Sequence, residues 1–106
     1  MLDTGIDIPA PRNTNIIASN SGFVTTATYS NSGYGNRVII DHGGGYKTLY
    51  AHCNSLNVKV GDFVAQGDVI AFVGTTGLST GNHLHFEYLI NGKNYDPLDY
   101  VVKGRR

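Results

Sequence analysis

The sequence has little that would point to several common classes of small protein. Its single cysteine, Cys53, excludes an internal disulfide and leaves the redox compartment open. Eight basic and eight acidic residues give no net charge, so the composition does not favour nucleic acid or an anionic membrane as a partner. No apolar run reaches the length of a membrane span. The 106 residues suffice for one core, and we expect a single domain over residues 1–106.

A long helical period is also missing, and 14 glycines separate short runs rich in β-branched and aromatic residues. This pattern predicts an all-β domain, a compact β-sandwich or barrel-sandwich-like fold with little or no helix. Strands are expected over residues 15–19, 22–30, 37–42, 46–52 and 83–90, the first of them after the prolines at positions 9 and 11. Short strands broken at Gly61 and Gly67 are expected within residues 56–74. Turns are expected at residues 43–45, 61, 67 and 91–93, and a helical turn within residues 96–101.

Two histidines stand on either side of a leucine in "GNHLHFE", residues 81–87. In a strand, residues two apart share a face, so His83, His85 and Glu87 would point one way while Leu84 and Phe86 face the core. The two imidazoles would lie about 7 Å apart along the strand. One could then bind a metal while the other reaches the attacking water, with Glu87 as a hydrogen-bond acceptor for the ligand. Taken alone, the pair also fits a solvated polar face.

Two further residues favour a site. His52 ends the run "LYAHC", where Tyr50 and His52 should share a face and Cys53 should turn to the opposite face as a small core residue. Asp7 lies between two isoleucines in "TGIDIP". A carboxylate at the rim of a core needs a partner such as a cation or a metal.

Four segments in order resemble the LytM/lysostaphin-type zinc metallopeptidases. They are "GIDIPAP", "GYGNRVIIDHGGGYKTLYAH", "VKVGDFVAQGDVIAFVGTTGLSTGNHLHFE" and "NYDPLDY", and the resemblance extends from about residue 2 to residue 101. It implies a compact β domain with a central groove, one zinc ion, and cleavage of peptide bonds in bacterial peptidoglycan.

The resemblance also implies roles for individual residues. Asp7 and His85 fall on two zinc-ligand positions, and His52 and His83 fall on the two catalytic-histidine positions. The remaining zinc ligand of the family is a histidine four residues before Asp7, where this sequence has Asp3. Because zinc accepts carboxylate oxygen, Asp3 is a candidate replacement ligand. It would make the centre less positive, so that zinc would polarise the bound water less. We also expect weak or absent zinc binding, because a missing histidine ligand would leave zinc with only two protein donors. Alternatively, Asp3 is too short to reach the zinc or marks a fragment boundary.

The mechanism implied is metal-assisted hydrolysis without a nucleophilic side chain. One of His52 and His83 would take a proton from the attacking water, and the other would donate a hydrogen bond to the tetrahedral oxyanion. Tyr34, Asn36 and residues 75–82 are expected as walls of the groove.

Two other readings compete with this one. The first is a catalytically inactive LytM-like module of the bacterial envelope, which binds cell-wall peptide or a partner protein; Asp3 favours it. The second is a lipoyl- or biotinyl-carrier-like domain, because "VKVGDFVAQGDVI" resembles the turns of those sandwiches. Lys93 would have to be the carrier lysine, and the histidines would then be unexplained.

A peptidoglycan substrate requires a location outside the cytoplasm. We therefore expect an extracellular or cell-envelope location in a bacterium and a chain that is a fragment of a longer exported protein. The expected partners are a peptidoglycan peptide and possible envelope proteins, with no nucleic acid and no membrane span in this chain. The sequence leaves open which peptide bond is cut.

Overall fold

The structure, a computed structural model, describes residues 5–95 and confirms the all-β prediction. Within these residues no helix is present, and so none that could cross a membrane. The strands are β1 (Ile6–Pro9), β2 (Asn15–Ile17), β3 (Gly22–Thr28), β4 (Asn36–Gly43), β5 (Tyr46–Leu56), β6 (Phe63–Val64), β7 (Val69–Val73), β8 (His83–Ile90) and β9 (Lys93–Tyr95). The helical turn predicted within residues 96–101 lies outside the described residues, as does Asp3.

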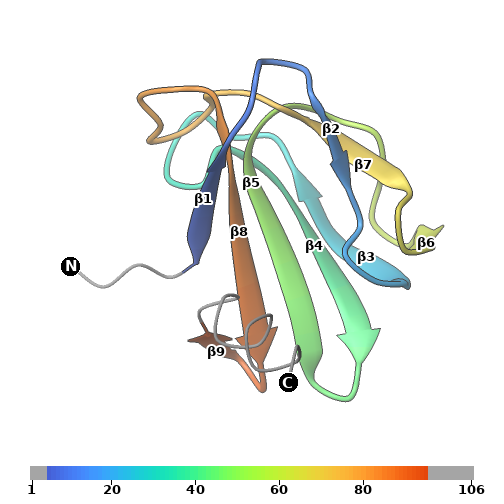
Figure 1. Ribbon diagram of the computed structural model, residues 1–106. Coiled ribbons are helices and arrows are strands. Elements are labelled where there is room, and N and C mark those ends of the chain that lie inside the picture. Colours follow the sequence, from blue (N-terminus) through green and yellow to red (C-terminus); the bar gives the residue numbers. More distant parts are fainter. Residues whose placement is uncertain (1–4, 96–106) are drawn as a thin grey trace, which may run out of the picture.

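The described strands form one antiparallel sheet whose main path runs β1-β8-β5-β4-β3-β6. Figure 1 shows β8, β5, β4 and β3 side by side, with β2 and β7 at the upper right of the view, off this path, where β7 pairs with β5. The long strand β5 belongs to both parts of this sheet. Its first residues pair with β4 and β8, and its last residues, from Cys53 onward, pair with β7. Because β5 changes partner, the sheet closes around a core, as the predicted sandwich-like fold requires.

The core lies between the β2–β7 pair and the inner face of the main strands. Its buried members come from seven strands and one connecting residue: Ile16, Ala18, Val24, Val38, Ile40, Tyr50, Cys53, Val64, Ile70, Ala71, Val73 and Phe86. Cys53 is fully buried there, as predicted, and burial raises the pKa of its thiol to about 12. A thiol in this state is protonated, which excludes it as a nucleophile in the folded protein.

The two Gly-Asp turns are confirmed and have the same local geometry. Gly61 and Gly67 have φ of 94° and 89°, a region that side-chain-bearing residues avoid. In each turn the aspartate that follows accepts a hydrogen bond from a backbone amide three residues earlier: Asp62 from Lys59 and Asp68 from Ala65. The similarity of the segments "VGDFV" and "QGDVI" therefore reflects a repeated turn.

Two strands were not predicted. β1 lies at an edge of the sheet and pairs with β8, although the first strand was expected only after the prolines. Pro9 is tolerated because it ends an edge strand. β9 follows the tight turn at Asn91 and Gly92 and pairs with the end of β8. Both strands are short, and their pairing with β8 supplies the hydrogen bonds that define them.

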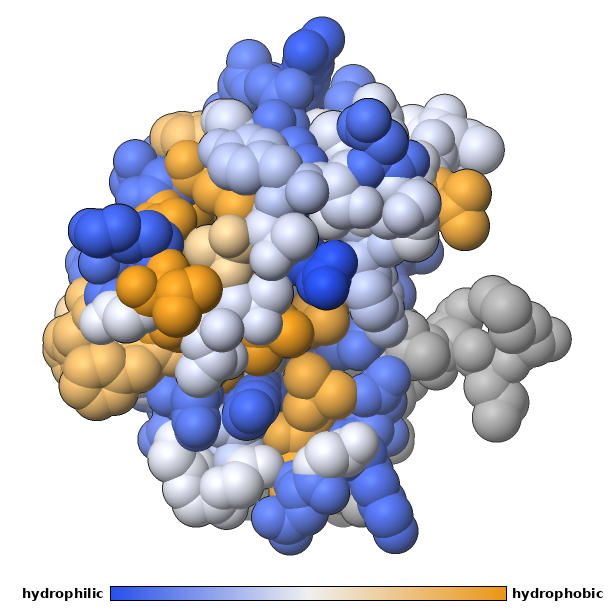
Figure 2. Space-filling view, turned by 180° about the vertical axis from the view of Figure 1, so that it is seen from behind, coloured by the Kyte–Doolittle hydropathy of each residue, from blue (hydrophilic) through white to orange (hydrophobic). Residues whose placement is uncertain are grey.

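The surface carries apolar residues in small patches. Figure 2 shows these patches interspersed with hydrophilic side chains on the face opposite to the view of Figure 1. Among the large apolar residues that are exposed, Phe23 and Phe63 form an edge-to-face pair with ring centroids 5.2 Å apart. Leu78, in the loop before β8, is 83% exposed.

Candidate active site

Strand β8 carries the first part of the site on one face. His85 pairs across the sheet with Ala51, and Glu87 pairs with Leu49. Phe86 belongs to the core cluster, and Leu84 packs against it from the same side. The alternation predicted for "HLHFE" is therefore observed, with the two histidines and Glu87 away from the core.

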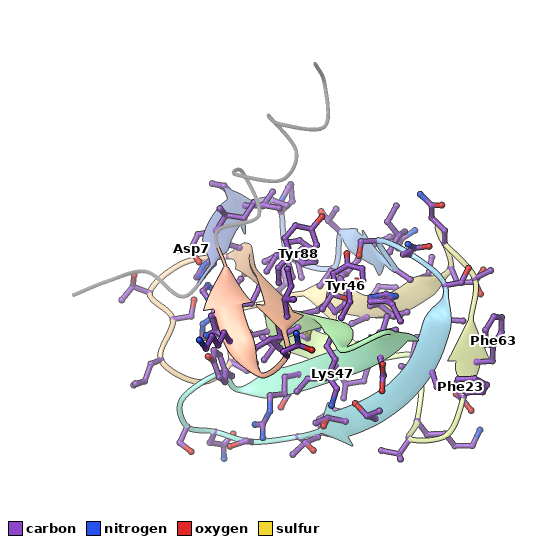
Figure 3. The ribbon with its side chains drawn as sticks, turned by 90° about the horizontal axis from the view of Figure 1, so that it is seen from below. Asp7, Phe23, Tyr46, Lys47, Phe63 and Tyr88 are labelled. Carbon is purple, nitrogen blue, oxygen red and sulfur yellow. The ribbon has the colours of Figure 1, made fainter. Side chains whose placement is uncertain are left out.

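Asp7 reaches this face from β1. In the register of the two strands, Asp7 lies opposite His85, and their side chains meet with Oδ1 2.8 Å from Nδ1. The same oxygen lies 3.4 Å from Nε2 of His83. Figure 3 shows Asp7 on the edge strand β1, at the opposite end of the view from the Phe23–Phe63 pair. Pairing of β1 with β8 thus brings together residues that are 78 positions apart in the sequence.

His52 reaches the site by a route that the sequence reading did not predict. Tyr50 and His52 were expected to share a face, but the ring of Tyr50 lies in the core, 5.2 Å from that of Phe86. His52 has a left-handed backbone with φ of 60°, which breaks the alternation of β5. Its ring instead lies 5.1 Å from that of His83 and 6.0 Å from that of His85. The prediction that Tyr50 and His52 share a face was therefore wrong.

Backbone carbonyls hold the imidazole rings of His52 and His83, the two histidines expected to be catalytic and not zinc ligands. Nδ1 of His52 lies 2.6 Å from the carbonyl oxygen of Thr76, and Nδ1 of His83 lies 2.8 Å from that of Gly81. A carbonyl oxygen only accepts, so Nδ1 carries the proton in each neutral ring and Nε2 is the nitrogen open to a reactant. Burial lowers the pKa of His52, which favours the neutral ring.

His85 lies between two carboxylates. Its Nε2 is 2.8 Å from Oε2 of Glu87, and its Nδ1 faces Asp7. These contacts, the hydrogen bond to Glu87 foremost, raise the pKa of His85. Glu87 is only 1% exposed, and its Oε2 also accepts a hydrogen bond of 2.7 Å from the hydroxyl of Tyr34. Glu87 thus has the acceptor role expected from the sequence.

A pocket of about 250 Å³ opens above these side chains. Its lining consists of Gly33, Tyr34, His52, Leu78 and His85. Two of the expected walls are therefore present, Tyr34 and the loop of residues 75–82. Asn36 does not line this pocket: it is 7% exposed, and its amide bonds the backbone of Ser30 and of Asn54.

The donor set suits zinc but is incomplete among the described residues. A carboxylate oxygen and an imidazole nitrogen converge at Asp7 and His85, and zinc binds both donor types. A buried carboxylate, Glu87, holds the other nitrogen of the imidazole, an arrangement that recurs behind histidines that ligate metals. Over residues 5–95, no three His, Cys, Asp or Glu side chains are arranged to hold a metal. A third ligand would have to come from elsewhere, and Asp3 remains the prediction.

A pocket on an antiparallel β domain, with a carboxylate–histidine pair beside two further histidines, is the arrangement expected of a metallopeptidase site. The comparison with known families agrees, because the model for Peptidase family M23 matches residues 2–97. The chain belongs to this family. The resemblance seen in the sequence is therefore confirmed.

Relatives and solved structures show the same kinship. The chain is 47% identical over 101 residues to the DD-carboxypeptidase/endopeptidase Mpg of Neisseria meningitidis, covering 95% of this chain and 23% of that protein. It is 43% identical over 93 residues to the peptidoglycan DD-endopeptidase ShyC of Vibrio cholerae, covering 88% and 21%. A zinc-containing peptidase from Vibrio cholerae superposes with a TM-score of 0.83 at 35% identity, covering 87% of this chain and 28% of that one. The chain thus spans about a quarter of the length of the curated relatives it matches.

Proposed function

We propose that this chain is a zinc-dependent endopeptidase domain that cleaves peptide bonds in bacterial peptidoglycan. The observation that carries the proposal is the convergence of Asp7 and His85 beside His52 and His83, with His52 and His85 lining one pocket. Relatives named as peptidoglycan endopeptidases support the substrate class. They also support an extracellular or cell-envelope location for this chain.

Asp7 and His85 would hold the zinc ion, with Asp3 as the predicted third ligand. When bound, zinc would polarise the scissile carbonyl and increase the acidity of the attacking water. On this chain, Glu87 keeps Nε2 of His85 engaged as a donor, so that Nδ1 is the nitrogen directed toward Asp7.

We assign proton acceptance to His52. Its Nδ1–H is engaged by Thr76, and burial favours the neutral ring, so Nε2 is an unprotonated acceptor. We assign stabilisation of the oxyanion to His83, which in its protonated form would donate from Nε2, 3.4 Å from Oδ1 of Asp7. Leu78 and Tyr34 would contact the peptide on either side.

The test is digestion of purified cell walls by the zinc-loaded chain, with the released fragments identified by mass spectrometry. We expect new amino termini within peptides, and much slower release by His52→Ala. Binding of walls without release by the unmodified chain would overturn the proposal and select the inactive module.

The role of Asp3 is tested separately by Asp3→His. This change restores the ligand set of two histidines and one aspartate that the family resemblance implies, and we expect tighter zinc binding and faster wall digestion. Competition with a chelator measures the affinity. Equal affinity in both proteins would mean that residue 3 already serves as a ligand or does not reach the zinc.

A further inference from the structure

Tyr34 contacts both halves of the candidate site, although it was predicted only as a groove wall. It lies in the loop between β3 and β4. Its backbone carbonyl accepts a hydrogen bond of 2.7 Å from the amide of His52, the residue with the left-handed backbone. Its hydroxyl donates to Glu87, and its ring stacks on His85 with centroids 5.8 Å apart and planes 25° apart.

The hydroxyl of Tyr34 bonds the same carboxylate oxygen that holds the imidazole of His85. Tyr34 and His85 both donate to Oε2 of Glu87, at 2.7 and 2.8 Å. A carboxylate that is 1% exposed depends on such donors, because water does not reach it. Removal of the phenolic donor would leave Oε2 of Glu87 with one hydrogen bond fewer and so weaken its hold on Nε2 of His85.

We propose that Tyr34 is a positioning residue of the metal centre. Acting through Glu87, it keeps Nε2 of His85 protonated and engaged, and so keeps Nδ1 directed at Asp7; its ring sets the plane of the imidazole. The proposal rests on the proposed function in one respect, the role of His85 as a ligand. Through its backbone carbonyl, Tyr34 also holds His52 at its distance from the proposed ligand His85.

The first experiment measures zinc affinity by chelator competition in Tyr34→Phe, which keeps the ring and removes the hydroxyl. Loss of a partner behind a metal ligand typically weakens metal binding 10–100-fold, and we expect a loss in this range. The matched control is Tyr29→Phe, whose hydroxyl accepts a hydrogen bond from the amide of Leu56 instead. Equal affinity in Tyr34→Phe and the unmodified chain would overturn the proposal.

A double variant tests whether Tyr34 acts through Glu87. If it does, Tyr34→Phe combined with Glu87→Ala should bind zinc no more weakly than Glu87→Ala alone. If the losses of zinc affinity caused by the two substitutions were additive, Tyr34 would not act through Glu87. His85→Ala separates the two proposals: retained zinc affinity in that variant would refute the ligand assignment, whereas loss there with no change in Tyr34→Phe would refute only the role of Tyr34.

A second readout needs no metal. Long-range proton–nitrogen spectra report which ring nitrogen of His85 carries the proton at a pH where the ring is neutral. We expect the Nε2–H form to dominate in the unmodified chain and in Tyr29→Phe, and the two tautomers to mix in Tyr34→Phe. Unchanged dominance of Nε2–H in Tyr34→Phe would overturn the proposal.

Discussion

Strands β8 and β5 both deliver histidines to the site, but they do so by different means. β8 is regular, and simple alternation places His83 and His85 on the face away from the core. β5 would direct His52 into the core by the same rule, and only its left-handed backbone turns the ring toward the other histidines. The first placement follows from the strand itself. The second depends on contacts with two loops, at Tyr34 and Thr76.

The largest expected effects separate the roles of the histidines on the two strands. His85→Ala should lose bound zinc, because it removes a proposed ligand. His52→Ala should keep most of the zinc and lower kcat/KM about 10²–10⁴-fold, the usual contribution of a general base. Metal analysis beside wall digestion measures both. If both variants kept zinc equally well, the assignment of roles would be wrong.

A substitution at Gly35 should disrupt the contact between the two loops that hold His52. A side chain there would bring Cβ into collision with the backbone of Thr76, whose carbonyl holds the His52 ring. Gly33 has a similar φ of 55° but open space around it, so it is the matched control. We expect Gly33→Ala to cost about 1–2 kcal/mol of unfolding free energy for the left-handed backbone alone.

Gly35→Ala should cost clearly more than this control, because the two loops must also separate. Urea unfolding of the metal-free protein measures both variants. Similar losses in the two would show that the contact between the loops is unimportant.

Glycine and alanine substitutions test the backbone difference directly. At position 52, the glycine variant should be more stable than the alanine variant by about 1 kcal/mol, because alanine is strained at φ of 60°. At position 83, in the regular strand, the order should reverse, since glycine costs about 0.5–1 kcal/mol in a strand. The same order at both positions, measured by urea unfolding, would mean that the backbones do not differ.

The smallest effect concerns titration in the metal-free protein. Burial lowers the pKa of His52 below its ordinary value of 6.5, and the hydrogen bond to Glu87 raises the pKa of His85 above it. His85 therefore stabilises the fold fully below its unfolded pKa, and this contribution disappears as the pH rises through its folded pKa. His52 has the opposite effect, and stability falls as the pH decreases below 6.5 toward its folded pKa. NMR titration of the two rings should resolve the opposite directions, and shifts in the same direction would contradict this account.

Much of the fold and part of the site could be predicted because they depend on local pattern. The face of β8 follows from the alternation of "HLHFE", and the turns at Gly61 and Gly67 follow from glycine and an aspartate that bonds a nearby amide. Strand β1 was missed because four residues ending in proline have no period long enough to recognise.

The sequence by itself determined that the domain is all-β, where its turns lie and on which face of β8 two histidines stand, because each of these depends on residues within a few positions. Only the tertiary structure decided that Asp7 lies opposite His85, that His52 leaves the alternation of β5, and that Tyr34 reaches Glu87. Those arrangements depend on hydrogen bonds and ring contacts between segments far apart in the chain. Such contacts can hold one residue in a backbone conformation that its own preference disfavours, and no local pattern records them.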